Sequence, residues 1–163
     1  MSAKPKASRP HMPDYGIQPE NEGQGLMDWA EAERKLVAAR NYWISSVTPE
    51  GRAHAAPVWG LWHGGRFFFG TGADSQKDQN LKANPSLVLH LESGDDVLIV
   101  EGEAAIEEDE GLLAELGQQY EAKYEVAALV PPASIYALKP KKAFAWLEAS
   151  FPGTATRWVF SEG

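Results

Sequence analysis

The expected fold is decided by residues 54–84, which read HAAPVWGLWHGGRFFFGTGADSQKDQNLKAN. Two runs rich in aromatic and apolar residues flank Gly64-Gly65, a dipeptide that supplies the positive φ angles of a tight hairpin. The second run ends at Thr71-Gly72, and a Ser-x-Lys-x-x-Asn pattern follows at residues 75–80. We therefore expect two paired strands, a polar turn and a short helix. A hydroxyl, the free N–H groups of a helix start and one lysine together are typical of an anion site, most simply for a phosphate.

Composition limits the class of protein. The chain has 163 residues, enough for one substantial core, with 44% hydrophobic and 23% charged residues. The net charge of −8 argues against general binding to nucleic acid or to an anionic membrane, because both need a basic face. Cysteine is absent, which excludes disulfides, thiolate nucleophiles and cysteine-ligated metals. No apolar run has the length of a signal peptide core or a membrane span, so we expect a cytoplasmic protein.

The chain divides into two expected parts. Residues 1–25 are rich in Pro, Gly, Lys and polar residues, and we predict an extended or partly disordered N-terminal strap with some order from about Arg9. Residues 26–163 are expected to form one cofactor-binding domain. Its helices are predicted at residues 28–41, 76–83 and 107–124.

About seven short strands, joined mostly by hairpins, are expected in that domain. Pro57 within the predicted strand 53–62 marks an edge or a bulge, since proline cannot donate to the ladder. Two further strands are expected on either side of Pro140, at 134–139 and 142–148, and Gly102 marks a bend in strand 97–106. This arrangement predicts a mainly β fold, a small antiparallel barrel with peripheral helices.

Five short motifs, in this order and spacing, carry a resemblance to a known family. They are Arg9-Pro-His-Met-Pro-x-Tyr-Gly-Ile, Gly51-Arg52-x-His54-x-x-Pro57-Val58-Trp59-Gly60, Ser75-x-Lys77-x-x-Asn80-Leu81, Val100-Glu101-Gly102-x-Ala104 and Thr156-Arg157-Trp158-x-Phe160. With these motifs the chain resembles the FMN-binding split-barrel proteins related to pyridoxamine 5′-phosphate oxidase, and is most similar to their bacterial flavin- and deazaflavin (F420)-dependent oxidoreductase branch. The resemblance implies an antiparallel Greek-key split β-barrel.

The same resemblance implies a homodimer with two flavin-type cofactors, FMN or F420, in clefts between the subunits. Ser75 and Lys77, with Asn80, would grip the phosphate. The ring system would lie along the strand that carries Pro57-Val58-Trp59 and its neighbour that ends at Thr71. Further residues expected to contact the cofactor are His54, Arg157 and Trp158.

The sequence departs from the family where two cations are usual. Relatives commonly read Ser-Arg-Lys-x-Arg-Asn-Leu, whereas this chain has Gln76 and Gln79 at the arginine positions and Asp78 beside them. Arginine binds phosphate bidentately and is always charged, so glutamine cannot replace it. We expect Lys77 to carry most of the remaining charge, and the cofactor to bind weakly or to be a different ligand.

Two functions from different classes follow. In the first, the protein is an enzyme in which a reduced cofactor passes a hydride to a small organic substrate, and no side chain needs to be the nucleophile. In the second, it is a binding or sensor protein for a flavin, haem or tetrapyrrole without turnover. A lone histidine on a strand, such as His54, is more often structural than functional. The scattered histidines predict no metal site, and no catalytic residue is assigned.

Overall fold

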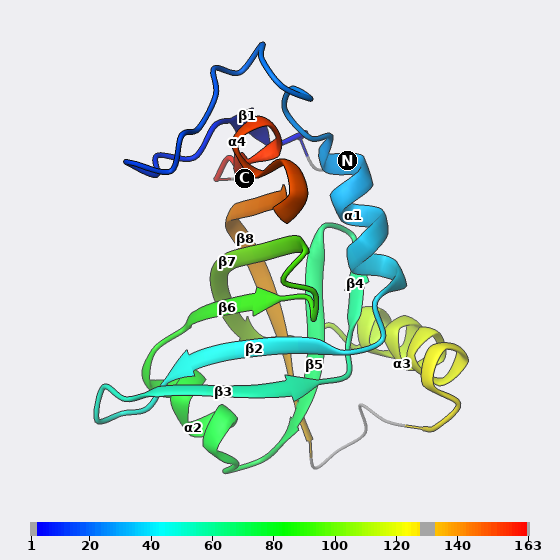
Figure 1. The fold of residues 1–163 in the computed structure, drawn as a ribbon. Helices are drawn as coiled ribbons and strands as arrows, with labels where there is room; N and C mark the ends of the chain where they lie inside the picture. Colours follow the sequence, from blue (N-terminus) through cyan, green and yellow to red (C-terminus); the bar gives the residue numbers. More distant parts are fainter. Residues whose placement is uncertain (1–2, 128–132, 163) are drawn as a thin grey trace.

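In the computed structural model, which describes residues 3–127 and 133–162, nine antiparallel strands form a rolled sheet with helices around it (Figure 1). This confirms the split-barrel class. In chain order the elements are β1 (Lys6–Ser8), α1 (Trp29–Ala38), β2 (Tyr42–Val47), β3 (Ala53–Val58), β4 (Leu61–His63), β5 (Arg66–Gly72), α2 (Gln76–Ala83), β6 (Ser86–His90), β7 (Asp96–Ile106), α3 (Glu110–Tyr124), β8 (Ala133–Leu147), a 3₁₀ turn (Glu148–Ser150), α4 (Phe151–Thr154) and β9 (Thr156–Val159).

The strand order leaves the barrel open between β3 and β4, each of which has one described partner strand. The main path is β1-β9-β8-β7-β6-β2-β3, and β5 joins it by pairing with β8 and carries β4 on its other side. The long strand β8 pairs with β7 along its length, with β5 through its first half and with β9 through its second half. Among the described strands, β3 pairs with β2 alone. The barrel is therefore split beside β3.

Buried aromatic side chains fill the barrel and explain the position of α1. Asp28 caps the helix by accepting a hydrogen bond from the N–H of Ala30, as its side chain predicts. The buried side of α1 places Trp29 edge-on to Trp158, with ring centres 5.3 Å apart, and Trp29 also contacts Trp62. Edge-to-face contacts of this kind add to the burial of apolar area. The helix thus lies against the main core beside β4.

A second, smaller core lies under α3. The helix was expected from residue 107, but it begins at Glu110 because Asp109 is the N-cap and accepts from the N–H of Leu112 at 2.9 Å. Its buried face packs Leu116, Tyr120 and Tyr124 against residues of β4, β5 and β8. The apolar spacing in this segment therefore identified the correct face of the helix.

Two strand expectations were wrong in their boundaries. The residues around Pro140 form the single strand β8 rather than two strands, because a bulge in β8 leaves Lys141 as the extra residue and places the proline opposite Gly102 of β7. A Cβ atom on Gly102 would lie 2.1 Å from the carbonyl oxygen of Lys139, so the close approach requires glycine. The predicted strand 53–62 is interrupted after Val58, and Gly60 separates β3 from β4.

The N-terminal segment is tied to the sheet. Order begins earlier than the expected Arg9, since β1 pairs with β9 and extends the sheet at the edge far from β3. The Arg9 guanidinium donates to five carbonyl oxygens, which belong to Pro19, Glu22, Gly25, Gly153 and Ala155. The last two of these carbonyls lie in and just after the short helix α4. Within the described residues, no helix combines the length and the apolar character that crossing a bilayer requires.

Candidate functional site

The open edge of β3 is the first part of the site. Along this strand Ala53, Ala55 and Pro57 are exposed on the outer face, while His54, Ala56 and Val58 are half-buried on the other. Pro57 thus lies on an edge strand, as its missing N–H predicted. A planar molecule lying along this edge would meet the unpaired side of the backbone together with side chains of both faces.

The start of α2 is the second part of the site. Ser75 is the N-cap, and its Oγ accepts from the N–H of Asp78 at 3.2 Å and lies 2.8 Å from the Oγ1 of Thr71 at the end of β5. The N–H groups of the first helical turn are the usual partners of an anion at such a position. The structure therefore brings the hydroxyls of Thr71 and Ser75 together, although Thr71 was expected beside the ring and Ser75 at the phosphate.

Lys77 lies on the first turn of α2 and is half-exposed. It forms no hydrogen bond or ion pair with any residue in the ranges 3–127 and 133–162. The two neighbouring glutamines are engaged within the helix, since Gln76 donates to Asn80 at 2.7 Å and Gln79 donates to the carbonyl of Asp74 at 2.8 Å. Lys77 is consequently the cation that the first turn of α2 presents to a ligand.

Asn80 does not face that ligand position. Its side chain is 0% exposed and donates to the Oγ of Ser46 on β2 at 3.0 Å, while it accepts from Gln76. His54 lies opposite Ser46 in the β2–β3 register and so occupies the same half-buried face. Asn80 holds α2 against the barrel, and its side chain points into the protein and away from the expected phosphate position.

Asp78, which adds a negative charge beside Gln76 and Gln79, is paired inside the protein. The carboxylate is buried and accepts from Tyr136 at 2.6 Å, from the N–H of Asp74 at 2.9 Å and from Lys82 at 2.8 Å. Burial alone would raise the pKa of Asp78, but the hydrogen bonds from Lys82, Tyr136 and Asp74 outweigh it and lower the pKa to about 2. Its charge is balanced inside the protein.

Arg157 and Trp158 are neighbours on β9 and point to opposite faces of the sheet. Trp158 is 1% exposed and packs on Trp29 in the core, so it does not line a cofactor site. Arg157 pairs with Phe144 in the register of β8 and β9 and is half-buried. Thr71, just before α2, pairs with Ser134 near the start of β8, ten residues before Phe144. Arg157 and the start of α2 therefore lie toward opposite ends of β8 within one copy of the chain.

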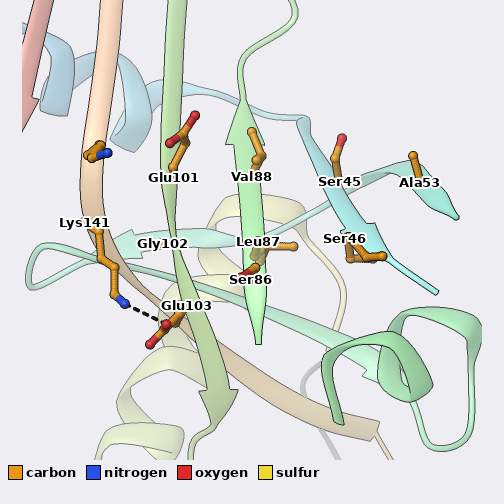
Figure 2. Close-up of a pocket in the computed structure, with 12 residues that line it drawn as sticks. Ser45, Ser46, Ala53, Ser86, Leu87, Val88, Glu101, Gly102, Glu103 and Lys141 are labelled. Atoms are coloured by element: carbon orange, nitrogen blue, oxygen red, sulfur yellow. Dashed lines mark hydrogen bonds and ion pairs between the residues drawn. The ribbon is translucent and has the colours of Figure 1, made fainter. Parts of the chain in front are cut away.

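A groove of about 530 Å³ runs across the sheet beside these elements (Figure 2). It crosses β3, β2, β6, β7 and β8, and the ion pair between Lys141 and Glu103, 2.6 Å long, spans one side of it. Its lining mixes small, acidic and basic residues, which are Ser45, Ser46, Val47, Ala53, Ser86, Leu87, Val88, Glu101, Gly102, Glu103, Lys141 and Lys142. This face offers complementary charges of both signs.

A basic and aromatic corner at the far end of β3 was missed by the sequence reasoning, except for Trp59. Trp59 is 38% exposed and stacks on Tyr124 of α3, with ring centres 4.7 Å apart. The exposed guanidinium of Arg40 lies 5.0 Å from the Trp59 ring centre. Lys123 lies 5.2 Å from the Tyr124 ring centre. In the sequence, this corner was indicated by Lys123 beside Tyr124 at the C-terminal end of α3.

Burial shifts the pKa values of the lysine and the tyrosines in this corner. Burial lowers the pKa of Lys123 to about 8, and the nearby charge of Arg40 adds to the effect. Burial also raises the pKa of Tyr42 and of Tyr124. Among the described residues, no group of three or more His, Asp or Glu side chains has the arrangement of a metal site. The chemistry of the site therefore rests on cations, hydroxyls, backbone groups and aromatic rings.

Comparisons with known proteins agree on the fold. The family model described as pyridoxamine 5′-phosphate oxidase matches residues 29–147. A conserved hypothetical protein from Mycobacterium tuberculosis is 22% identical, with a TM-score of 0.68, and the match covers 76% of this chain and 87% of that one. The haem storage protein of Vibrio cholerae is 14% identical, with a TM-score of 0.61 and coverage of 71% and 92%. A protein titled F420 reductase is 22% identical, with a TM-score of 0.53 and coverage of 68% and 94%. No curated protein matches the sequence.

Proposed function

The chain belongs to the pyridoxamine 5′-phosphate oxidase family, and from this premise we propose that it is an oxidoreductase that binds FMN or F420 along the open edge of β3. The observation that carries the proposal is the position of Lys77. This lysine stands unpaired among the described residues at the start of α2, at the same end of the barrel as the beginning of β3. A cation at a helix start, next to an unpaired strand edge, suits a molecule with a phosphate tail and a planar ring.

The phosphate would be held by Lys77, by the hydroxyls of Thr71 and Ser75 and by the free N–H groups of α2. The ring would lie along the backbone of Pro57 and Val58, which offers unpaired polar groups at its open side. A bound flavin or deazaflavin would supply the hydride chemistry, while the chain binds, orients and excludes water. β3 is about 20 Å long at 3.3 Å per residue, which gives room for both the tail and the ring.

The substrate would be a small organic molecule that approaches from the Trp59 corner. Arg40 presents its exposed guanidinium there, and no acidic side chain among the described residues pairs with it. A guanidinium fork beside an aromatic face favours a planar molecule with a carboxylate or phosphate. The proposal therefore places the cofactor tail at one end of β3 and the charged group of the substrate at the other.

A homodimer completes the site in this proposal. Arg157 and the start of α2 lie toward opposite ends of β8 within one copy, so a second copy would bring an arginine from this position to the cofactor. The groove beside β3 carries Glu101 and Glu103 next to Lys141 and Lys142, a mixture that can be self-complementary across a twofold axis. The outer face of the sheet is thus the proposed dimer surface.

A second candidate function is a flavin, haem or tetrapyrrole binding protein without turnover. The observation in its favour is that Gln76 and Gln79 are engaged within α2, which leaves Lys77 as the one cation of this first turn for a phosphate. The likeness to a haem storage protein agrees with this candidate at the level of the fold. A ligand with less anionic charge at the α2 end would suit it.

Titration of the purified protein with FMN, with F420 and with haem distinguishes the candidates. Fluorescence changes report FMN and F420, and a Soret band reports haem. Tight binding of either redox cofactor, followed by substrate-dependent reoxidation of its reduced form, supports the enzyme. Binding of haem alone favours the second candidate. If neither FMN nor F420 binds below about 100 μM, the proposed oxidoreductase is wrong.

A further inference from the structure

The amine of Lys123 has surroundings unlike those of the ion-paired lysines. Its Nζ donates to the Tyr42 hydroxyl at 2.8 Å and to the carbonyl of Gly60 at 3.2 Å. No carboxylate contacts it within the described part of the chain. By contrast, Lys35 and Lys82 each pair with an aspartate at less than 3 Å. Lys123 is therefore a half-buried amine without a counter-ion.

The hydrogen bonds of this amine fit its neutral form. The Tyr42 hydroxyl donates to the carbonyl of Leu36 at 2.5 Å, so it must accept from Lys123. The Gly60 carbonyl also accepts. A neutral amine has two N–H groups, and both are used by these acceptors. Its lone pair then remains free for reaction.

Burial and the charge of Arg40 oppose the charged form and outweigh the rings of Tyr42 and Tyr124, which lie 4.8 and 5.2 Å from the amine and favour a cation. Arg40 and Lys123 both contact the ring of Tyr124, at 5.6 Å and 5.2 Å from its centre, so two cations share one aromatic side chain. Tyr42 from β2 and Tyr124 from α3 are the other titratable groups against the amine, and burial raises the pKa of both, so neither supplies a negative charge. Desolvation and a nearby cation are the two means by which proteins make a lysine nucleophilic at neutral pH.

We propose that Lys123 is a modification site, where the amine condenses with a planar aldehyde that carries an anionic group. Arg40 would hold the carboxylate or phosphate, and the exposed face of Trp59 would support the ring. The amine nitrogen attacks the carbonyl carbon, a C–N bond forms and the oxygen takes a proton to give a carbinolamine. Loss of water then leaves a protonated imine. The charged lysine and the aldehyde together thus yield the iminium and one water, with no oxidant or reductant.

This inference does not depend on the proposed cofactor. It uses residues of the Arg40 corner and requires neither Lys77 nor a redox group. The test is therefore made on the protein without added FMN or F420. Failure of the aldehyde reaction leaves the cofactor titrations unaffected, and failure of cofactor binding leaves the aldehyde reaction unaffected.

The experiment treats the native protein at pH 7.5 with 4-carboxybenzaldehyde at a limiting concentration and traps the imine with cyanoborohydride. Peptide mass mapping then gives the labelling rate of each lysine. At this pH an amine of pKa about 8 is roughly one-quarter neutral, against about 0.1% for an ordinary lysine. We expect Lys123 to be labelled at least about tenfold faster than Lys35 or Lys82, with a rate that rises with pH to a midpoint near 8.

Two controls make the result specific. Uncharged 4-methylbenzaldehyde should lose most of the preference for Lys123, because it offers Arg40 no anion. The variant Arg40→Gln should lower the labelling of Lys123 several-fold, while Arg34→Gln, an exposed arginine of α1 that pairs with Glu31, should leave it unchanged. Equal labelling of all lysines, a midpoint above 10, or a preference that Arg40→Gln does not alter would overturn the proposal.

Discussion

The buried carboxylate of Asp78 gives the sharpest test of how α2 is held. We predict that Asp78→Asn destabilises the protein, because the side chain accepts from Tyr136, from the N–H of Asp74 and from Lys82 in the native state. An asparagine keeps the shape but loses the charge, and it offers one acceptor oxygen in place of two. The helix would then lose the group that connects its first turn to β8.

The pKa of Asp78 gives the magnitude. The shift from 3.8 to about 2 corresponds to roughly 2–3 kcal/mol of stability, at about 1.4 kcal/mol for each pKa unit. Because the folded-state value is the lower one, this contribution is complete above the unfolded value near 4 and is lost as the pH falls toward 2. We therefore expect Asp78→Asn to cost about 2–3 kcal/mol at pH 7 and to remove this part of the acid sensitivity.

Urea unfolding at pH 7, pH 4 and pH 2.5 measures both effects. The control is Asp96→Asn, which breaks the half-exposed ion pair with Lys35 and should cost no more than about 1 kcal/mol. The reasoning is refuted if Asp78→Asn is as stable as the native protein at pH 7. It is also refuted if the native protein and the variant lose stability equally between pH 4 and pH 2.5.

Three further predictions concern ligand binding, the strap and the bulge. Lys77→Ala should weaken FMN or F420 at least about tenfold with little change in melting temperature, and Gln76→Arg should tighten the same ligand; fluorescence titration measures both, and unchanged affinities contradict the phosphate role. Arg9→Ala should expose residues 10–25 to a non-specific protease, since five carbonyl contacts are lost; a digestion rate equal to that of the native protein would oppose this. Gly102→Ala should cost at least about 1–3 kcal/mol in urea unfolding, because its Cβ would lie 2.1 Å from a backbone oxygen.

Local chemistry made the fold largely predictable from the sequence. The Gly64-Gly65 hairpin, the Asp28 and Ser75 caps and the edge position of Pro57 each follow from a residue's own conformational preference or hydrogen-bonding groups. The extent of β8 did not follow. Whether a proline ends a strand depends on its pairing, and here a bulge at Lys141 of the same strand, opposite Gly102 of β7, accommodates it.

The site was less predictable because it depends on the direction of side chains. The eight residues of α2 carry no clear apolar stripe, and the polar residues Asp78 and Asn80 are both buried beside Leu81. With no apolar stripe to show the buried face, the Ser-x-Lys-x-x-Asn motif placed Asn80 toward the ligand. The alternation of side chains along a strand did apply to Arg157 and Trp158. Adjacent strand residues point to opposite faces of the sheet, so these two cannot face the same pocket. The Arg40 corner joins three distant segments, so the local sequence indicated the pair Lys123-Tyr124 but not the residues that it meets.

Pro57 also limits what can attach to β3. An unpaired strand normally invites another strand to add to it, and this is a route to aggregation. A proline on such a strand normally turns its nitrogen outward, where it interrupts the row of donors that an incoming chain needs. Meanwhile β1 already covers the opposite end of the sheet. β3 is thus a poor template for an added strand, while its open side stays available to a small flat molecule.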